Sequence, residues 1–167
     1  EMGKPIGEAL GEVDKCAWNC EVVADLAPEW LADHEIASGA SRSWLSYEPI
    51  GVVFAVMPWN FPFWQVLRFA SAALAAGNAA LLKHSPDVTG CALAIEKLFA
   101  DAGAPSALFR SLVVAAEDVP DVSRRIVADP RVVTKSYGST FRRSLPCPLL
   151  SVASRADLLA RVEALFA

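Results

Sequence analysis

Continuous apolar runs alternate along the chain with segments in which apolar residues recur every three or four positions. Residues 50–57 are almost entirely apolar, which is typical of a strand covered on both faces. Residues 63–76 then show helical spacing, with Pro62 at the start and Gly77 just past the end. The same alternation predicts further strands at 79–82 (ending at Lys83), 108–114 and 132–136, and helices at 89–102 and 121–128.

This order of elements predicts βαβ units with right-handed crossovers. The expected fold class is therefore α/β, a Rossmann-like parallel sheet with flanking helices. Ligands of such sheets bind beyond the carboxyl ends of the strands. We expect the functional chemistry where three predicted strands end, at residues 57–60, 83–86 and 136–140.

The chain before residue 50 has a different character. Residues 5–27 predict a long helix, with Pro5 in its first turn and Pro28 at its end, and residues 38–47 predict a loop or an exposed strand pair. The helical spacing predicts one buried face made of Ile6, Leu10, Val13, Ala17, Cys20 and Ala24. The helix at 89–102 is likewise predicted to share one face among Cys91, Ala94, Ile95, Leu98 and Ala102.

Composition indicates one domain of 167 residues that is rich in apolar side chains, with 54% hydrophobic and 20% charged residues. Part of this apolar surplus is expected to cover a partner subunit. A net charge of −4 without a basic stripe argues against a nucleic-acid partner. No run without a charge or an amide is longer than the one at 49–59, which falls short of the about 20 residues that cross a bilayer, so no membrane partner is expected.

Four cysteines do not form a dense scaffold, which predicts a reducing, cytoplasmic location. Cys16 and Cys20 lie one helical turn apart, which suits either a metal pair or two small residues packed on one face. Packing is favoured because no third or fourth ligand follows at a suitable spacing. No metal site is predicted.

Asn60 stands alone between apolar residues at the end of the first predicted strand. Its side chain can satisfy the backbone of a turn, or it can offer a fixed NH2 group to a developing oxyanion. Pro58 and Pro62 stiffen the turn on both sides, which favours a side chain held in place.

The two other strand ends carry weaker signals. Lys83 suits either a solvated strand end or a contact to nucleotide hydroxyls and phosphates, and a lone His84 is more often structural than catalytic. Gly138 and Ser139 could cradle a phosphate through backbone N–H groups. The chain has no GxGxxG, no Walker lysine motif and no complete catalytic set.

Taken in order from residue 1 to about 140, the segments resemble the aldehyde dehydrogenase superfamily, and most closely its NAD(P)-dependent succinate-semialdehyde branch. The segments that carry the resemblance are EMGKPIGEAL at 1–10, SWLSYEPIGVV at 43–53, PWNFPFWQ at 58–65, AGNAALLKHS at 76–85 and YGST at 137–140.

The resemblance implies roles for particular residues. Asn60 matches the catalytic oxyanion-hole asparagine, whose amide binds the aldehyde oxygen, and Lys83 matches the lysine that bonds the adenine-side ribose. Ser139 matches a serine near the pyrophosphate. The implied cofactor-binding set is Met57, Pro58, Trp59, Asn60, Lys83, His84, Ser85, Pro86, Gly138 and Ser139.

Three positions depart from the family pattern. Pro86 replaces a glutamate that grips the ribose hydroxyls, which removes a repulsion against a 2′-phosphate, although Asp87 is adjacent. The expected cofactor is therefore NADP or NAD. Tyr137 replaces a threonine, and Arg143 replaces a glycine at a tight helix–strand contact.

The family pattern fails after Thr140 and resumes only in part, which suggests an internal deletion. We expect a single partial domain, with a helix and oligomerisation-type segment at 1–49, a nucleotide-binding core at 50–140 and a degenerate tail at 141–167. The segments with the general-base glutamate and the nucleophilic cysteine are missing, and Cys147 between two prolines is not expected to substitute.

The predicted function is NAD(P)-dependent oxidation of a small aldehyde or semialdehyde to the acid, if missing parts complete the chain, with no turnover by the chain alone. Two alternatives stay open. One is a non-catalytic nucleotide-binding or oligomer-partner module, and the other is a remnant without a ligand. The expected protein partner is a second copy or a full-length paralogue.

Overall fold

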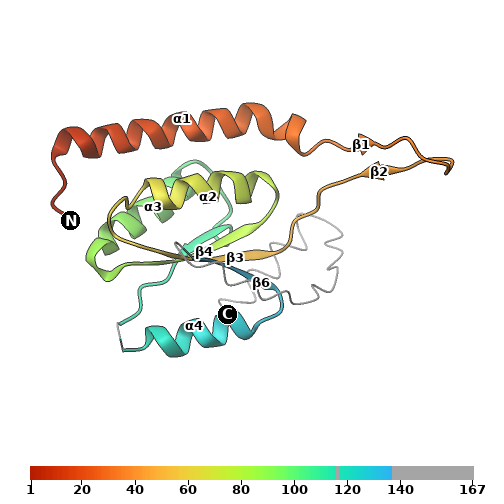
Figure 1. Ribbon diagram of the computed structural model, residues 1–167. Helices are drawn as coiled ribbons and strands as arrows, with labels where there is room; N and C mark the ends of the chain where they lie inside the picture. The colour runs from red at the N-terminus through yellow and green to blue at the C-terminus, as the bar shows by residue number, and fades with distance from the viewer. Residues whose placement is uncertain (116, 137–167) are drawn as a thin grey trace.

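The computed structural model describes residues 1–115 and 117–136 (Figure 1). Its centre is a four-stranded sheet in which all neighbouring strands are parallel, in the order β5–β4–β3–β6. The strands are β3 (Val52–Met57), β4 (Ala79–His84), β5 (Phe109–Ser111) and β6 (Val132–Ser136). The predicted α/β fold with a parallel sheet is confirmed.

Helices cover both faces of this sheet. α2 (Trp64–Ala75) and α3 (Thr89–Asp101) lie on one face, and α4 (Val119–Ala128) lies on the other (Figure 1). The chain winds from β3 through β4 to β5 in one direction, and then returns to place β6 on the free side of β3. The direction of winding therefore reverses at β3, between β4 and β6. Open α/β sheets bind ligands at such a reversal, just beyond the carboxyl ends of the strands.

The buried side chains form one apolar cluster on each face of the sheet. The cluster under α2 and α3 includes Ala55, Val66, Leu82 and Ile95, and each of these is almost completely buried. The cluster on the other face is built around Phe54. β3 and β4 are covered on both faces, as their unbroken apolar runs predict.

α1 (Ile6–Trp30) packs across α2, and its buried face differs from the predicted one. Ile6, Leu10 and Val13 are 76%, 59% and 46% exposed, whereas Glu12 and Cys16 are buried. The prediction was wrong because contact with α2 is made by a carboxylate and a small thiol, which hydrophobic spacing does not detect.

The end of α1 also differs from the prediction. Pro28 lies inside the helix instead of ending it. It falls in the last turn, where a missing N–H costs one bond only, and the N–H of Leu31 still bonds the carbonyl of Ala27 at 2.9 Å.

The remaining elements agree with the sequence in kind and differ in length. β1 (His34–Glu35) and β2 (Trp44–Leu45) form an exposed antiparallel pair that projects from the body, one of the two predicted options (Figure 1). β5 is shorter than the predicted 108–114. On α3 the predicted Ile95 is buried, but Leu98 is 52% exposed and the second buried residue is Ala92, which the predicted face did not include.

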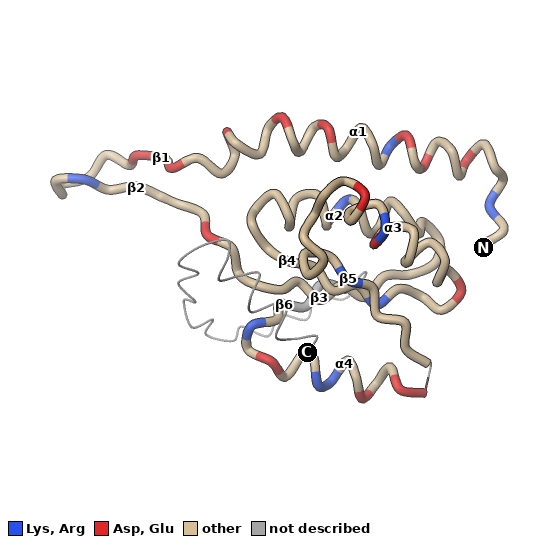
Figure 2. Tube along the Cα trace, turned by 180° about the vertical axis from the view of Figure 1, so that it is seen from behind, with Lys and Arg blue, Asp and Glu red and all other residues tan. Residues whose placement is uncertain are grey.

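Acidic residues lie along the whole length of α1, as Figure 2 shows.

Within the part of the chain that the structure describes, no helix is long and apolar enough to cross a membrane.

Candidate functional site

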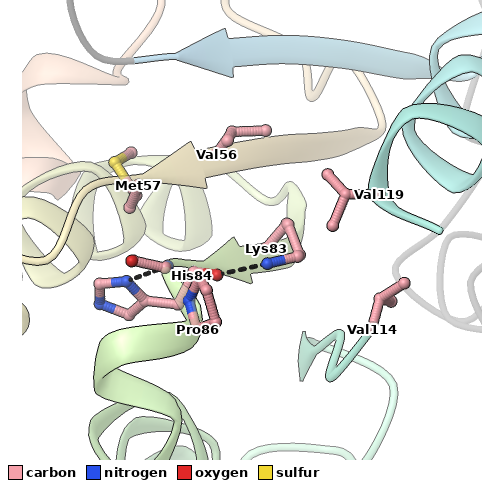
Figure 3. Close-up of a pocket in the computed structure, with 8 residues that line it drawn as sticks. Val56, Met57, Lys83, His84, Pro86, Val114 and Val119 are labelled. Atoms are coloured by element: carbon pink, nitrogen blue, oxygen red, sulfur yellow. Dashed lines mark hydrogen bonds between the residues drawn. The ribbon is translucent and has the colours of Figure 1, made fainter. Parts of the chain in front are cut away.

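A cavity of about 250 Å³ opens at the carboxyl ends of β3 and β4 (Figure 3). The two strands are in register so that Val56 lies opposite Lys83 and Met57 opposite His84, which brings both strand ends to one place. The described residues that line the cavity are Val56, Met57, Lys83, His84, Ser85, Pro86, Val114 and Val119.

Five of the residues predicted from the strand ends therefore meet in one cavity. Sequence reasoning missed Val56, Val114 and Val119, of which the last two come from the segment after β5 and the start of α4. No sequence signal marks Val56, which lies within an unbroken apolar run, although the structure shows it as the single exposed position of β3. Nothing in the local sequence marks the other two, because they reach the site only through the chain's return to β6.

Lys83 places a cation inside this cavity. The residue is only 6% exposed, and its Nζ donates to the carbonyl oxygen of His84 at 2.6 Å. Desolvation lowers the pKa of Lys83, because burial disfavours the charged form. Within residues 1–115 and 117–136 no carboxylate forms an ion pair with Lys83. A buried ammonium with a carbonyl as partner is suited to receive an anion.

His84 holds the site together through both of its ring nitrogens. Its Nδ1 accepts from the N–H of Ser85 at 2.9 Å, so its Nε2 carries the proton and donates to the carbonyl of Pro62 at 2.9 Å. Desolvation lowers the pKa of His84, which keeps the ring neutral. The side chain therefore ties β4 to the turn at 58–62 and has no ring nitrogen left for a cofactor.

Ser85 and Pro86 form the rim of the cavity. Pro86 begins the short 3₁₀-helix η1 (Pro86–Val88), and the Ser85 hydroxyl donates to Asp87 Oδ2 at 2.8 Å. Asp87 is exposed and is not among the residues that line the cavity. The Asp87 carboxylate, which the sequence places next to the expected ribose position, thus accepts a hydrogen bond from the Ser85 hydroxyl.

Asn60 lies in the turn between β3 and α2, with Pro58 and Trp59 before it. Its Oδ1 is buried and has no hydrogen-bond partner among the described residues. The carbonyl oxygen of Asn60 therefore does not satisfy the turn backbone, which was one of its two possible roles. An unpaired buried acceptor costs about 1–3 kcal/mol, which favours a functional reason for the amide.

Several other predictions have a structural outcome or lie outside the described residues. Burial raises the pKa of Cys16 to about 11 and also raises that of Cys20, so both thiols stay protonated, and Cys16 packs in the core. Among the described residues no group of three or more His, Cys, Asp or Glu could hold a metal. Tyr137, Gly138, Ser139, Arg143 and Cys147 lie outside the described residues.

The fold and the site together define a class of protein. It is the class of α/β proteins that bind a ligand at the carboxyl ends of a parallel sheet, where the direction of winding reverses. The model of the aldehyde dehydrogenase family matches residues 1–139. The chain belongs to this family, as the resemblance of its segments predicted.

The relatives point to one branch of the family. A probable NADP(+) succinate-semialdehyde dehydrogenase of Synechocystis is 50% identical over 132 residues, which is 79% of this chain and 28% of that protein. An NADP(+) succinate-semialdehyde dehydrogenase of Mycobacterium leprae is 45% identical over 135 residues, 79% of this chain and 29% of the relative. The chain thus spans less than a third of the length of these relatives.

Solved structures agree. The succinic semialdehyde dehydrogenase of Streptococcus pyogenes in complex with NADP+ superposes with a TM-score of 0.73 at 34% identity, over 81% of this chain and 29% of that one. The succinate-semialdehyde dehydrogenase of Burkholderia pseudomallei gives a TM-score of 0.73 at 27% identity, over 96% of this chain and 30% of that one.

Proposed function

We propose that this chain forms the nucleotide-binding part of an NADP-dependent aldehyde dehydrogenase whose complete form oxidises a semialdehyde such as succinate semialdehyde. The observation that carries the proposal is the buried ammonium of Lys83, which lines the cavity beyond β4 and has a carbonyl oxygen as its partner. The names of the Synechocystis and Streptococcus proteins, which specify NADP and succinate semialdehyde, support the same choice.

The positive charge of the cavity lining suits a ribose that carries a phosphate. Among its described lining residues, Lys83 is the charged one and none is a carboxylate, because Pro86 stands where the sequence comparison expected a glutamate. Two unit charges about 4 Å apart attract by about 4 kcal/mol at an effective dielectric constant of about 20. A 2′-phosphate near Lys83 would gain this attraction without opposing repulsion, which favours NADP over NAD.

The residues predicted to bind the cofactor are assigned to different parts of it, starting from Lys83. Lys83 would hold the ribose phosphate, while Met57, Ser85 and Pro86, which line the same cavity, would contact the adenosine. Pro58 and Trp59 are assigned to the cofactor from the sequence alone, since they are not among the described residues that line this cavity. Gly138 and Ser139, outside the described residues, are assigned to the pyrophosphate. His84 would act only by keeping the two strand-end loops in register.

Asn60 is assigned to the aldehyde. When bound, the cofactor accepts the hydride that leaves the aldehyde carbon. The amide nitrogen of Asn60 would donate to the aldehyde oxygen as negative charge develops there. Removal of one such donor costs about 3 kcal/mol of transition-state stabilisation, so Asn60 would be a catalytic residue of the complete enzyme.

None of the described cysteines suits the nucleophile. Burial raises the pKa of Cys16 and of Cys91 to about 11, and it raises the pKa of Cys20, so these thiols are protonated at neutral pH. The nucleophile of the complete enzyme is therefore assigned to the portion of the relatives that this chain does not span. The same observation favours a second candidate, a nucleotide-binding module without turnover.

The proposal includes a cytoplasmic location and association with another protein chain. Free thiols at Cys16, Cys20 and Cys91 suit a reducing cytoplasm. The exposed aromatic residues of the β1–β2 arm, Trp44 at 50% and Tyr47 at 53%, suit association with a second copy or with a full-length paralogue.

Calorimetric titration of the chain tests the cofactor assignment. We expect NADP+ to bind at least about tenfold more tightly than NAD+, since the phosphate meets a buried cation whose partner is a neutral carbonyl oxygen. Adenosine 2′,5′-bisphosphate and adenosine 5′-monophosphate form a matched pair that isolates the 2′-phosphate, and the bisphosphate should show the same preference. Equal affinity within each pair, or no binding by any of the four compounds, would contradict the proposal.

A further inference from the structure

The first helix of the sheet domain lacks its own cap. The N-cap residue of α2, Phe63, makes no side-chain capping bond, and the first turn of α2 carries no acidic residue. The backbone N–H groups at a helix start have no partner within the helix and need one from elsewhere. They are also the groups that directly follow the turn carrying Asn60.

Glu12 of α1 supplies the missing cap across the interface between the two helices. Its Oε1 accepts from the N–H of Phe63 at 2.8 Å and from the N–H of Trp64 at 2.9 Å. Its Oε2 forms an ion pair with Lys4, and both of these side chains are less than 10% exposed. A buried carboxylate at a helix start gains from the helix dipole as well as from its two hydrogen bonds.

The same network reaches the residue after Asn60. The ammonium of Lys4 lies 4.1 Å from the centroid of the Phe61 ring, a cation–π contact. On the other side of the turn, His84 bonds the carbonyl of Pro62. Each of the three residues that follow Asn60 is therefore tied to a different group, while Asn60 Oδ1 itself has no partner among the described residues.

We propose that Glu12, assisted by Lys4, is a positioning residue that fixes the Asn60 amide by clamping residues 61–64 to α1. This gives the segment EMGKPIGEALGE at 1–12 a role in the site, although none of its residues is among those that line the cavity. That the fixed amide serves an aldehyde oxygen rests on the proposed function. The clamp itself does not, because it needs neither cofactor nor turnover.

Side-chain NMR of the chain with ¹⁵N-labelled asparagine tests the clamp. The sequence holds three asparagines, Asn19, Asn60 and Asn78. Asn19 Nδ2 donates to Ser71 Oγ at 2.8 Å and Asn78 Nδ2 donates to the carbonyl of Ala73 at 3.1 Å, so these two amides report on α2 itself. Asn60 reports on the turn.

The substitution Glu12→Gln keeps the shape and forces an NH2 group to face either Lys4 or the two backbone donors. We expect the Asn60 NH2 signals to shift and to lose their heteronuclear NOE, with the Asn19 and Asn78 signals unchanged. The amides of Phe63 and Trp64 should exchange about tenfold faster, as expected when a charge-assisted bond is lost. Lys4→Met should displace the Asn60 signals in the same direction, and Glu8→Gln, an exposed position on α1, should change none of them.

Two results would overturn the clamp. One is an unchanged Asn60 signal in both Glu12→Gln and Lys4→Met. The other is an equal change of all three asparagine signals, which would show that Glu12 stabilises the whole helix without a particular effect on the turn. Failure of NADP+ binding would leave these signals untouched, so the clamp and the proposed function fail separately.

Discussion

At the scale of single residues, the ring of His84 connects β4 to the turn that carries Asn60, and its protonation state decides whether that connection exists. The neutral ring accepts at Nδ1 and donates at Nε2. A protonated ring would have donors at both nitrogens, and the bond from the Ser85 N–H would be lost. Independently of this bond, burial of the ring disfavours its charged form and lowers the pKa of His84 below its ordinary value of 6.5.

This lowered pKa predicts acid sensitivity of the fold. Between the folded-state pKa and about 6.5 the unfolded chain binds more protons than the folded chain, so stability rises with pH there and falls as pH falls below about 6.5. We expect the melting temperature to decrease from pH 7 to pH 5. In His84→Gln that decrease should shrink, whereas His34→Gln, at an exposed histidine, should keep it. An identical pH profile in His84→Gln would contradict the assignment.

At the scale of elements, Asn78 joins the end of α2 to the start of β3. Its Oδ1 accepts from the N–H of Ile50 at 2.7 Å and of Gly51 at 3.1 Å, and its Nδ2 donates to the carbonyl of Ala73. Gly51 has a φ of +115°, and a Cβ there would lie 2.7 Å from the carbonyl oxygen of Arg131. The entry into β3 therefore depends on one buried amide and one glycine.

We expect Asn78→Ala to lower the free energy of unfolding by about 2–4 kcal/mol, because it leaves the buried N–H of Gly51 and the part-buried N–H of Ile50 without their acceptor. Asn19→Ala is the matched control, since it removes a single hydrogen bond to Ser71 at a half-buried site and should cost about 1 kcal/mol or less. Urea denaturation measures both. A loss for Asn78→Ala no larger than that for Asn19→Ala would show that the Asn78 bonds do not stabilise the entry into β3.

The elements also show what the sequence could predict and why. β3, α2, β4 and α3 followed from unbroken apolar runs and helical spacing, because both faces of the sheet are covered. The buried face of α1 could not be predicted in this way. Its contact with α2 depends on Glu12, a charged residue whose partners lie 51 and 52 residues away, and on Cys16 in place of larger side chains.

The residues of the candidate site also differ in how far the sequence could predict them. Met57 and residues 83–86 were predictable because parallel strands end at one edge of the sheet. The particular role of His84 was not, because it depends on the carbonyl of Pro62, which no local pattern reveals. The assignment of Gly138 and Ser139 stays a prediction, since both lie outside the described residues.

At the scale of the whole molecule, the chain leaves large apolar side chains exposed on α1 and on the β1–β2 arm. Trp18 is 60% exposed and Trp30 is 51% exposed, in addition to Ile6 and Leu10. The chain spans 28% of the Synechocystis relative. Contiguous exposed apolar surface of this kind commonly marks a contact with other protein. The cavity at the ends of β3 and β4, in contrast, is lined by described residues of this chain.

The central claim is that Lys83 is the buried cation that receives the 2′-phosphate of NADP. Calorimetric titration of NADP+ into Lys83→Met measures this most directly, with Lys97→Met as the control because Lys97 is exposed and paired with Asp101 on α3. The account predicts at least about a tenfold loss of NADP+ affinity in Lys83→Met, loss of the preference over NAD+, and no change in Lys97→Met. Undiminished NADP+ binding by a folded Lys83→Met chain would contradict it.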